Sequence, residues 1–169
     1  MGPFRAACEA YWAAGWRGLL PLPPRRKSPP PRGWTGRGAP YPSWADVRAW
    51  ADGPEGDGNI ALRLPDGLIG LDVDDYMDRA GGAHLDELTR HLGLLGESAV
   101  STARDDRSGI RLFRVPSGLR WPGQAAPGIE IIQATHRYAV VWPSVHPDTG
   151  GRYRWVGLND GEVPAWSTG

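Results

Sequence analysis

The sequence predicts an α+β domain. Apolar residues recur at helical spacing in three segments, residues 4–14, 44–51 and 82–92, whereas residues 99–156 carry a series of short strand patterns joined by turns with Gly or Pro. We expect the first helices to build a small α/β lobe and the later strands to build a mainly antiparallel sheet.

Each predicted helix has one apolar face. In the first helix, apolar residues recur at positions 4, 7, 8, 11 and 12, and Gly15 is expected to end it. Ser43 is the expected N-cap of the second helix. Leu85, Leu88 and Leu92 define the apolar face of the third, which we expect to pack against a sheet.

The strand patterns begin with a pair separated by a short turn. Residues 59–64 and 68–74 flank the sequence Pro-Asp-Gly, so we expect them to pair as a hairpin. Further strands are predicted at 99–103, 109–115, 129–133, 138–142 and 152–156. Residues 21–32 contain too many prolines for a helix or a central strand, so this segment is a loop, read either as an exposed arm whose four cations reach phosphates or as a solvated linker.

Length and charge bound the class of protein. A chain of 169 residues suits one domain at residues 1–160, with two lobes at about 1–65 and 66–160, and a tail at 161–169 that marks a point where further domains could follow. The formal net charge is zero, so any contact with nucleic acid must be local, weak or assisted by other segments. Of the 19 basic residues, only Lys27 is a lysine.

Cysteine usage and hydropathy indicate a cytoplasmic location. Cys8 is the only cysteine and cannot form an internal disulfide, and no Cys/His cluster has the spacing of a zinc site. No signal peptide is visible, and no apolar stretch approaches the length that crosses a bilayer. We therefore expect no contact with membranes.

Two carboxylates close the strand at 68–74. Asp72 and Asp74 are two residues apart, which places them on one face of a strand, while Ile69, Leu71 and Val73 face the opposite side. Hard cations such as Mg²⁺ or Mn²⁺ prefer carboxylate oxygens. The pair therefore suggests a divalent metal site and chemistry on phosphates, although an Asp-x-Asp that merely ends a strand is also common.

Two later strands carry matching polar residues. Glu130 stands among isoleucines, where an unpartnered carboxylate would be costly, so we expect it to be a third metal ligand with Asp72 and Asp74. Arg111 is held on a strand that begins after Ser108. Guanidinium forks onto phosphate oxygens, so Arg111, helped by Ser108, could bind a triphosphate; a surface salt bridge is the alternative.

Together these features resemble the primase–polymerase (prim-pol) domains of the archaeo-eukaryotic primase superfamily, over about residues 4 to 156. Leu-Asp-Val-Asp at 71–74 corresponds to the family's first motif, and Ser-Gly-Ile-Arg at 108–111 to its second. The Ile-Glu pair at 129–130 corresponds to the third, followed by a Tyr-x-Val-x-x-Pro-Ser-x-His segment at 138–146.

The resemblance implies an archaeo-eukaryotic primase-like fold, with an RRM-like antiparallel catalytic core that carries the acids on its open face. It also implies DNA-dependent primase and polymerase activity, in which nucleotides are transferred from (d)NTPs to a primer or an initiating nucleotide on single-stranded DNA during replication. Asp72, Asp74 and Glu130 would hold two Mg²⁺ or Mn²⁺ ions. A helicase domain or another replication partner is consistent with it.

The residues expected around the nucleotide are Ser108, Arg111, Lys27, Arg104 and His146. Arg111 stands where the family usually has His, and an arginine does not readily donate a proton or change its charge near neutral pH. It can still stabilise negative charge. His146 is read either as a phosphate contact or as a structural residue.

Two other classes compete with the active enzyme. One is a catalytically weak nucleotide- or nucleic-acid-binding module, in which Trp121, Tyr138 and Trp142 stack on bases. The other is a phosphohydrolase of the haloacid-dehalogenase type, but Tyr76 stands two residues after Asp74 and no suitably placed lysine follows. An EF-hand loop is excluded because no Gly stands at its sixth position.

Overall fold

Two antiparallel sheets form the centre of the molecule. The computed structural model describes residues 1–167. The smaller sheet has the strand order β1-β2-β8 and the larger one the order β6-β7-β3-β5-β4-β9. The strands are β1 (Leu19–Leu22), β2 (Asn59–Leu62), β3 (Leu68–Val73), β4 (Ala99–Thr102), β5 (Gly109–Arg114), β6 (Gln124–Ala126), β7 (Ile129–Ile132), β8 (Ala139–Val140) and β9 (Arg154–Gly157).

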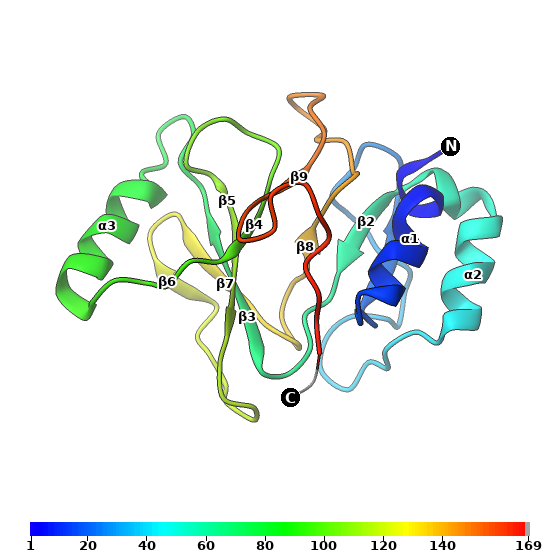
Figure 1. Ribbon diagram of the computed structural model, residues 1–169, viewed down its shortest axis with the longest axis horizontal. Coiled ribbons are helices and arrows are strands. Elements are labelled where there is room, and N and C mark those ends of the chain that lie inside the picture. The colour runs from blue at the N-terminus through cyan, green and yellow to red at the C-terminus, as the bar shows by residue number, and fades with distance from the viewer. Residues whose placement is uncertain (168–169) are drawn as a thin grey trace.

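The helices lie at opposite ends of this arrangement. Helices α1 (Pro3–Ala13) and α2 (Trp44–Asp52) lie beside the smaller sheet, and α3 (Gly81–Leu92) lies against the larger one (Figure 1). A short 3₁₀ helix, η1 (Pro54–Asp57), follows α2. The α+β prediction is thus confirmed, and the arrangement is compatible with a small primase-like domain.

Local signals placed the helices well. The Ser43 side chain accepts a hydrogen bond from the backbone N–H of Asp46, whose carboxylate accepts one from the N–H of Ser43, so the expected N-cap is part of a capping box. Helix α1 ends shortly before Gly15, which has a φ of 96° and crosses into the left-handed region that glycine favours.

The expected hairpin between residues 59–64 and 68–74 is wrong. Strand β2 pairs with β1 and β8, whereas β3 pairs with β5 and β7, so the turn at 65–67 carries the chain from one sheet to the other. Both edges of each strand are occupied by partners distant in sequence. Strand β6 was not predicted, while the five later strand patterns each correspond to a strand.

One apolar core connects the two sheets. It joins side chains of α1 and the smaller sheet, including Phe4 and Leu62, to Ile110, Leu112 and Ile132 of the larger sheet. The larger sheet therefore has two covered faces. The face toward the smaller sheet carries Asp72 beyond this core and is called the acidic face; the face under α3 is called the helical face. The division into lobes near residue 65 stays a prediction, as does the tail, of which residues 168 and 169 lie outside the described residues.

No helix in the described part of the chain has both the length and the apolar character needed to span a membrane.

Candidate active site

Two predicted metal ligands lie opposite each other on adjacent strands. Asp72 of β3 pairs in register with Glu130 of β7, and on its other side it pairs with Ile110 of β5. Directly opposed residues of antiparallel strands project to the same face, with Cβ atoms about 4.5–5.5 Å apart. The three therefore share the acidic face, and Asp74, two residues beyond Asp72, continues it.

Gly70 allows the sheet and its neighbours to pack closely behind the acids. A Cβ atom at this position would lie 2.9 Å from Cγ2 of Ile110 and 3.4 Å from both Ile132 and Leu64. The glycine thus seats Ile110 against the core. As a result, Ile110 is fixed beside Asp72, and its aliphatic side chain forms part of the cavity wall.

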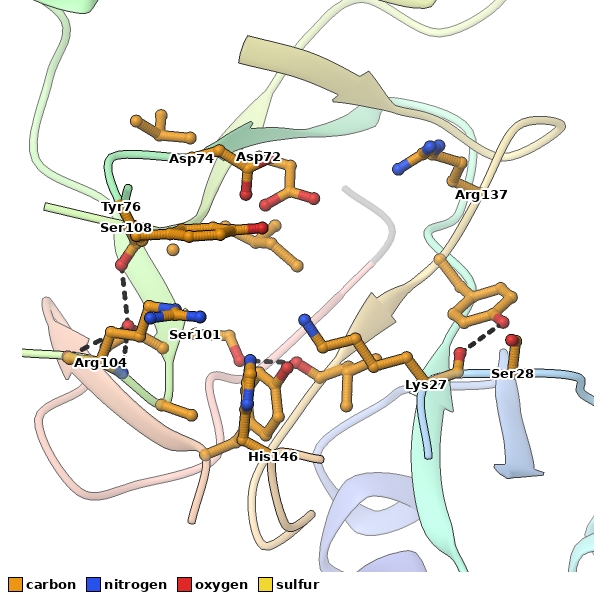
Figure 2. A pocket seen from close by; sticks show the side chains of 18 residues that line it. Lys27, Ser28, Asp72, Asp74, Tyr76, Ser101, Arg104, Ser108, Arg137 and His146 are labelled. Carbon is orange, nitrogen blue, oxygen red and sulfur yellow. Dashed lines mark hydrogen bonds between the residues drawn. The ribbon is translucent and has the colours of Figure 1, made fainter. Parts of the chain in front are cut away.

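A cavity of about 390 Å³ opens over the acidic face. Figure 2 shows Asp72 and Asp74 on one side of it, with Lys27, Arg104 and Arg137 arranged around the remainder. The residues that line it are Lys27, Ser28, Asp72, Val73, Asp74, Tyr76, Ser101, Thr102, Ala103, Arg104, Ser108, Gly109, Ile110, Arg137, Tyr138, Val140, His146 and Tyr153. Carboxylates and cations from four separate segments thus face one space.

The carboxylates repel one another. Burial and, to a lesser extent, the neighbouring charges of Asp74 and Glu130 raise the pKa of Asp72 to about 6, while Lys27 and Arg137 act in the opposite direction. Such a cluster is unfavourable for folding by itself, so cations are needed to balance it.

Arginines provide that balance at the two outer carboxylates. Arg79 forms an ion pair with Asp74, and Arg137 forms one with Glu130. About half of each arginine side chain is exposed, at 56% and 49%. Asp72 has no arginine partner of this kind in the described structure, and its nearest cationic influences are Lys27 and Arg137.

Lys27 is positioned by hydrogen bonds from the smaller sheet. The side-chain amide of buried Asn59 donates to the carbonyls of Arg26 and Val145, at 3.0 and 2.8 Å, and its oxygen accepts from the N–H of Val145. The hydroxyl of Tyr138 donates to the carbonyl of Lys27 at 2.7 Å. These contacts fix the proline-rich loop against the segment that leads to His146, so two predicted nucleotide contacts are held together.

His146 is buried and neutral. Its Nδ1 accepts hydrogen bonds from the backbone N–H groups of Asp148 and Thr149, both at 3.2 Å. Burial lowers the pKa of its imidazole, and the charges of Lys27 and Arg104 lower it further. The acceptor role of Nδ1 leaves the proton on Nε2, so a neutral donor lines the cavity.

Arg104 and Ser108 also reach this cavity. The guanidinium of Arg104 lies 3.9 Å from the ring centroid of Tyr76, a cation–π contact. The Ser108 hydroxyl accepts a hydrogen bond from the backbone N–H of Asp75 at 2.9 Å. Ser108 therefore ties β5 to the segment that follows the acidic strand, and its side chain is partly committed to that role.

Arg111 does not reach the cavity. It pairs in register with Leu71, so it projects to the helical face, where it borders a separate hollow beside Asp86 and Thr89 of α3. Its guanidinium donates to the carbonyls of Gly109 and Arg107. The residue of β5 that faces the acids is Ile110, one position earlier, because successive side chains of a strand alternate between its faces. The expected phosphate contact from Arg111 does not fit this placement.

Sequence reasoning missed several residues of the cavity. Arg137 and Tyr76 are the most prominent, and Ser28, Ser101 and Tyr153 also line it. Arg137 has a φ of 63°, in the left-handed region that a residue with a side chain rarely adopts. Only its position directly before the Tyr-x-Val segment could have indicated it from the sequence.

The carboxylates are of the type that binds a divalent cation, but their side chains do not converge on one point. Within residues 1–167, no group of three or more His, Cys, Asp and Glu side chains lies close enough to hold a metal ion. However, three carboxylates share one face, and Oε2 of Glu130 already has a cationic partner in the guanidinium of Arg137. The type of ligand and the placement of the carboxylates on one face therefore fit a metal site. Asp74 and Glu130 are each paired with an arginine, so both side chains would have to rotate away from these partners before the three carboxylates could converge on one ion.

Fold and cavity together define a class of protein: an α+β domain whose antiparallel sheet presents carboxylates to a cavity rimmed by cations, the combination that chemistry on phosphates requires. Comparison with known families gives the same class. The chain belongs to the family described as bifunctional DNA primase/polymerase, N-terminal, whose model matches residues 8–166. Neither a curated protein nor a solved structure matches the chain significantly.

Membership in this family confirms the resemblance noted in the sequence. It implies DNA primase or polymerase activity in general, with DNA and nucleotides as substrates, and thus a nucleotidyltransferase. Prim-pol domains generally depend on divalent metal ions.

Proposed function

We propose that this chain transfers nucleotides from (d)NTPs to a primer end or an initiating nucleotide on a single-stranded DNA template during replication. The observation that carries the proposal is the single cavity in which the carboxylates of Asp72 and Asp74 face Lys27, Arg104 and Arg137. Anionic groups for cations and cationic groups for a triphosphate are thus separated by only the width of one cavity.

In the proposed reaction, the primer 3′-oxygen attacks the α-phosphorus of the nucleotide and displaces pyrophosphate, while the hydroxyl proton leaves to water. Asp72, Asp74 and Glu130 would hold two Mg²⁺ or Mn²⁺ ions. Such ions, when bound, lower the pKa of the attacking hydroxyl and neutralise charge on the phosphates.

The remaining side chains of the cavity bind and orient. Lys27 and Arg104 would contact the triphosphate, because both are cationic side chains that line the space over the acids. His146 would donate a neutral hydrogen bond from Nε2 to a phosphate or a sugar oxygen. Ser108 would act mainly by holding β5 against the segment after Asp74.

A primer-extension assay tests the proposal. We expect Asp72→Asn/Asp74→Asn to lower extension by about 10³-fold or more, since several kcal/mol of charge stabilisation at the reacting phosphate would be lost. Asp78→Asn is the matched control, because Asp78 is an exposed acid four residues after Asp74. Extension by the double variant at the rate of the control would refute the assignment.

A second function is favoured by one observation. Because no three carboxylates converge in the described residues, a nucleotide- or nucleic-acid-binding module with weak catalysis is the competing interpretation. It predicts that the chain binds a labelled single-stranded oligonucleotide or a nucleotide but incorporates nothing in the presence of Mn²⁺. Incorporation that depends on Asp72 would exclude it.

A further inference from the structure

Arg137 is placed to serve two partners. It lies in the short connection between β7 and β8, it lines the cavity beside Lys27, and its guanidinium pairs with Glu130. Figure 2 shows it on the side of the cavity across from Arg104. Its backbone adopts φ 63°, a left-handed conformation that is unfavourable for a residue other than glycine. The connection therefore holds this arginine at the acids at some cost to stability.

The ion pair between Arg137 and Glu130 competes with any cation that needs the same carboxylate. A metal ion would use the oxygens of Glu130, and Oε2 of this residue is the oxygen with which the guanidinium of Arg137 pairs. An arginine side chain keeps its charge in proteins, so the loss of a proton cannot relieve the competition. Arg137 must therefore move when Glu130 takes a cation.

The cavity offers Arg137 a second anion. Nucleoside triphosphates carry oxygens that match the guanidinium fork, and the side chain already borders the space that a nucleotide would fill. The ion pair that must break is weak, since the Arg137 and Glu130 side chains are 49% and 36% exposed and solvent-exposed ion pairs contribute little to stability. A change of partner is thus within reach of the binding energy of one nucleotide.

We propose that Arg137 is a displaceable counter-charge, which neutralises Glu130 in the empty site and contacts the triphosphate of the incoming nucleotide once cations occupy the carboxylates. This inference rests on the proposed function, because it requires cations and a nucleoside triphosphate in the same cavity. It makes the binding of the two ligands interdependent: the nucleotide removes Arg137 from Glu130 and so favours the cation, and by linkage the cation favours the nucleotide.

Arg137→Gly is the variant that tests this role, because glycine suits the left-handed backbone and the substitution relieves strain there. Arg25→Gly is the matched control: Arg25 is an exposed arginine with φ 57° that does not line the cavity. Both variants lose one positive charge and one side chain at a residue whose backbone is left-handed. They differ in whether the lost side chain contacts Glu130.

Two affinities are measured by titration calorimetry, one for Mn²⁺ alone and one for α,β-methylene-dATP in the presence of saturating Mn²⁺. We expect Arg137→Gly to tighten Mn²⁺ binding by about 2–5-fold, as a competing cation is lost, and to weaken nucleotide binding by about tenfold, as a charged phosphate contact is lost. Arg25→Gly should change each affinity by less than about twofold. Opposite signs are the signature of a side chain that changes partner.

If Arg137 had a purely structural role, Arg137→Gly would weaken the binding of both ligands. If Arg137 only bound phosphate, the variant would leave the Mn²⁺ affinity unchanged. Either result overturns the inference. If the wild-type protein binds both ligands but Arg137→Gly shifts neither, the counter-charge is refuted while the proposed function stands. If the wild-type protein binds neither Mn²⁺ nor the nucleotide, the proposed function fails, and the inference fails with it.

Discussion

The two faces of the larger sheet are built from the same strands but serve different ends. On the helical face, Val73 and Ile129 are fully buried and pack with Leu85 of α3. One residue along each strand, the acidic face carries Asp72 and Glu130, whose charges oppose each other. Residues that stabilise the fold and residues expected to bind substrate or metal therefore alternate along each strand. Substitutions at adjacent positions should have opposite consequences.

The largest effect on stability is expected on the helical face. Ile129→Ala should destabilise the protein by about 3 kcal/mol, because it removes a fully buried side chain and leaves a cavity under α3. The free energy of unfolding from a urea titration measures this. Its neighbour Glu130→Gln should change stability by less than about 1 kcal/mol, and an equal loss in both variants would contradict the separation of roles.

Asp72→Asn should make the protein more stable at pH 8, by about 2 kcal/mol. The substitution removes a largely buried charge that Asp74 and Glu130 oppose. It should also abolish extension, so that stability and activity change in opposite directions. A less stable variant at pH 8 would show that the carboxylate is already compensated.

The same carboxyl group predicts a dependence of stability on pH. Its pKa is about 6 in the folded protein and about 4 in an unfolded chain, so the folded state binds more protons between these values. The contribution of Asp72 to stability is therefore lost as the pH rises from about 4 to about 6. The difference in stability between Asp72→Asn and wild type should grow over this range; a constant difference would contradict the raised pKa.

A smaller contrast separates two arginines on opposite faces. Arg104→Ala should weaken nucleotide binding by about tenfold, because a cation is removed from the cavity. Arg111→Ala should change it by less than about twofold, because Arg111 projects to the helical face and donates to backbone carbonyls. Titration with α,β-methylene-dATP checks both variants. Equal losses of nucleotide affinity in the two variants would indicate that Arg111 contacts the nucleotide after all.

The smallest effect is expected at the rim. Arg79 pairs with Asp74 but is 56% exposed. Arg79→Ala should therefore cost less than about 1 kcal/mol of stability and tighten Mn²⁺ binding by about two- to threefold. Calorimetric titration with Mn²⁺ measures this, and weaker binding would mean that Arg79 supports Asp74 rather than competing for it.

The sequence predicted the elements better than their partners. Helical spacing, the Ser43 cap and strand alternation are local signals, and each led to the correct type of element. The pairing of β3 with β5 and β7 depends on residues 36 to 62 positions away in the chain, which no local pattern records. The turn at residues 65–67 therefore suggested a hairpin that the structure does not contain.

In the site too, local patterns did not reveal how strands are paired, and there the error concerns a single residue. Alternation along a single strand was enough to predict that Asp72 and Asp74 share a face, whereas the position of Glu130 opposite Asp72 comes from the register of β3 and β7. Arg111 was assigned to that face from its motif position, although alternation relative to the acids depends on cross-strand register, which pairs Asp72 with Ile110 instead. Arg137 was missed because its role arises from a left-handed connection and not from a strand or helix pattern.

Binding of Mn²⁺ to wild type and to Asp72→Asn tests the central claim most directly, that carboxylates of the acidic face hold divalent cations. We predict that Mn²⁺ raises the unfolding temperature of the wild-type protein, and that it has little effect on Asp72→Asn, even though this variant is more stable without metal. An equal rise for both proteins would place the bound cation elsewhere and contradict the account.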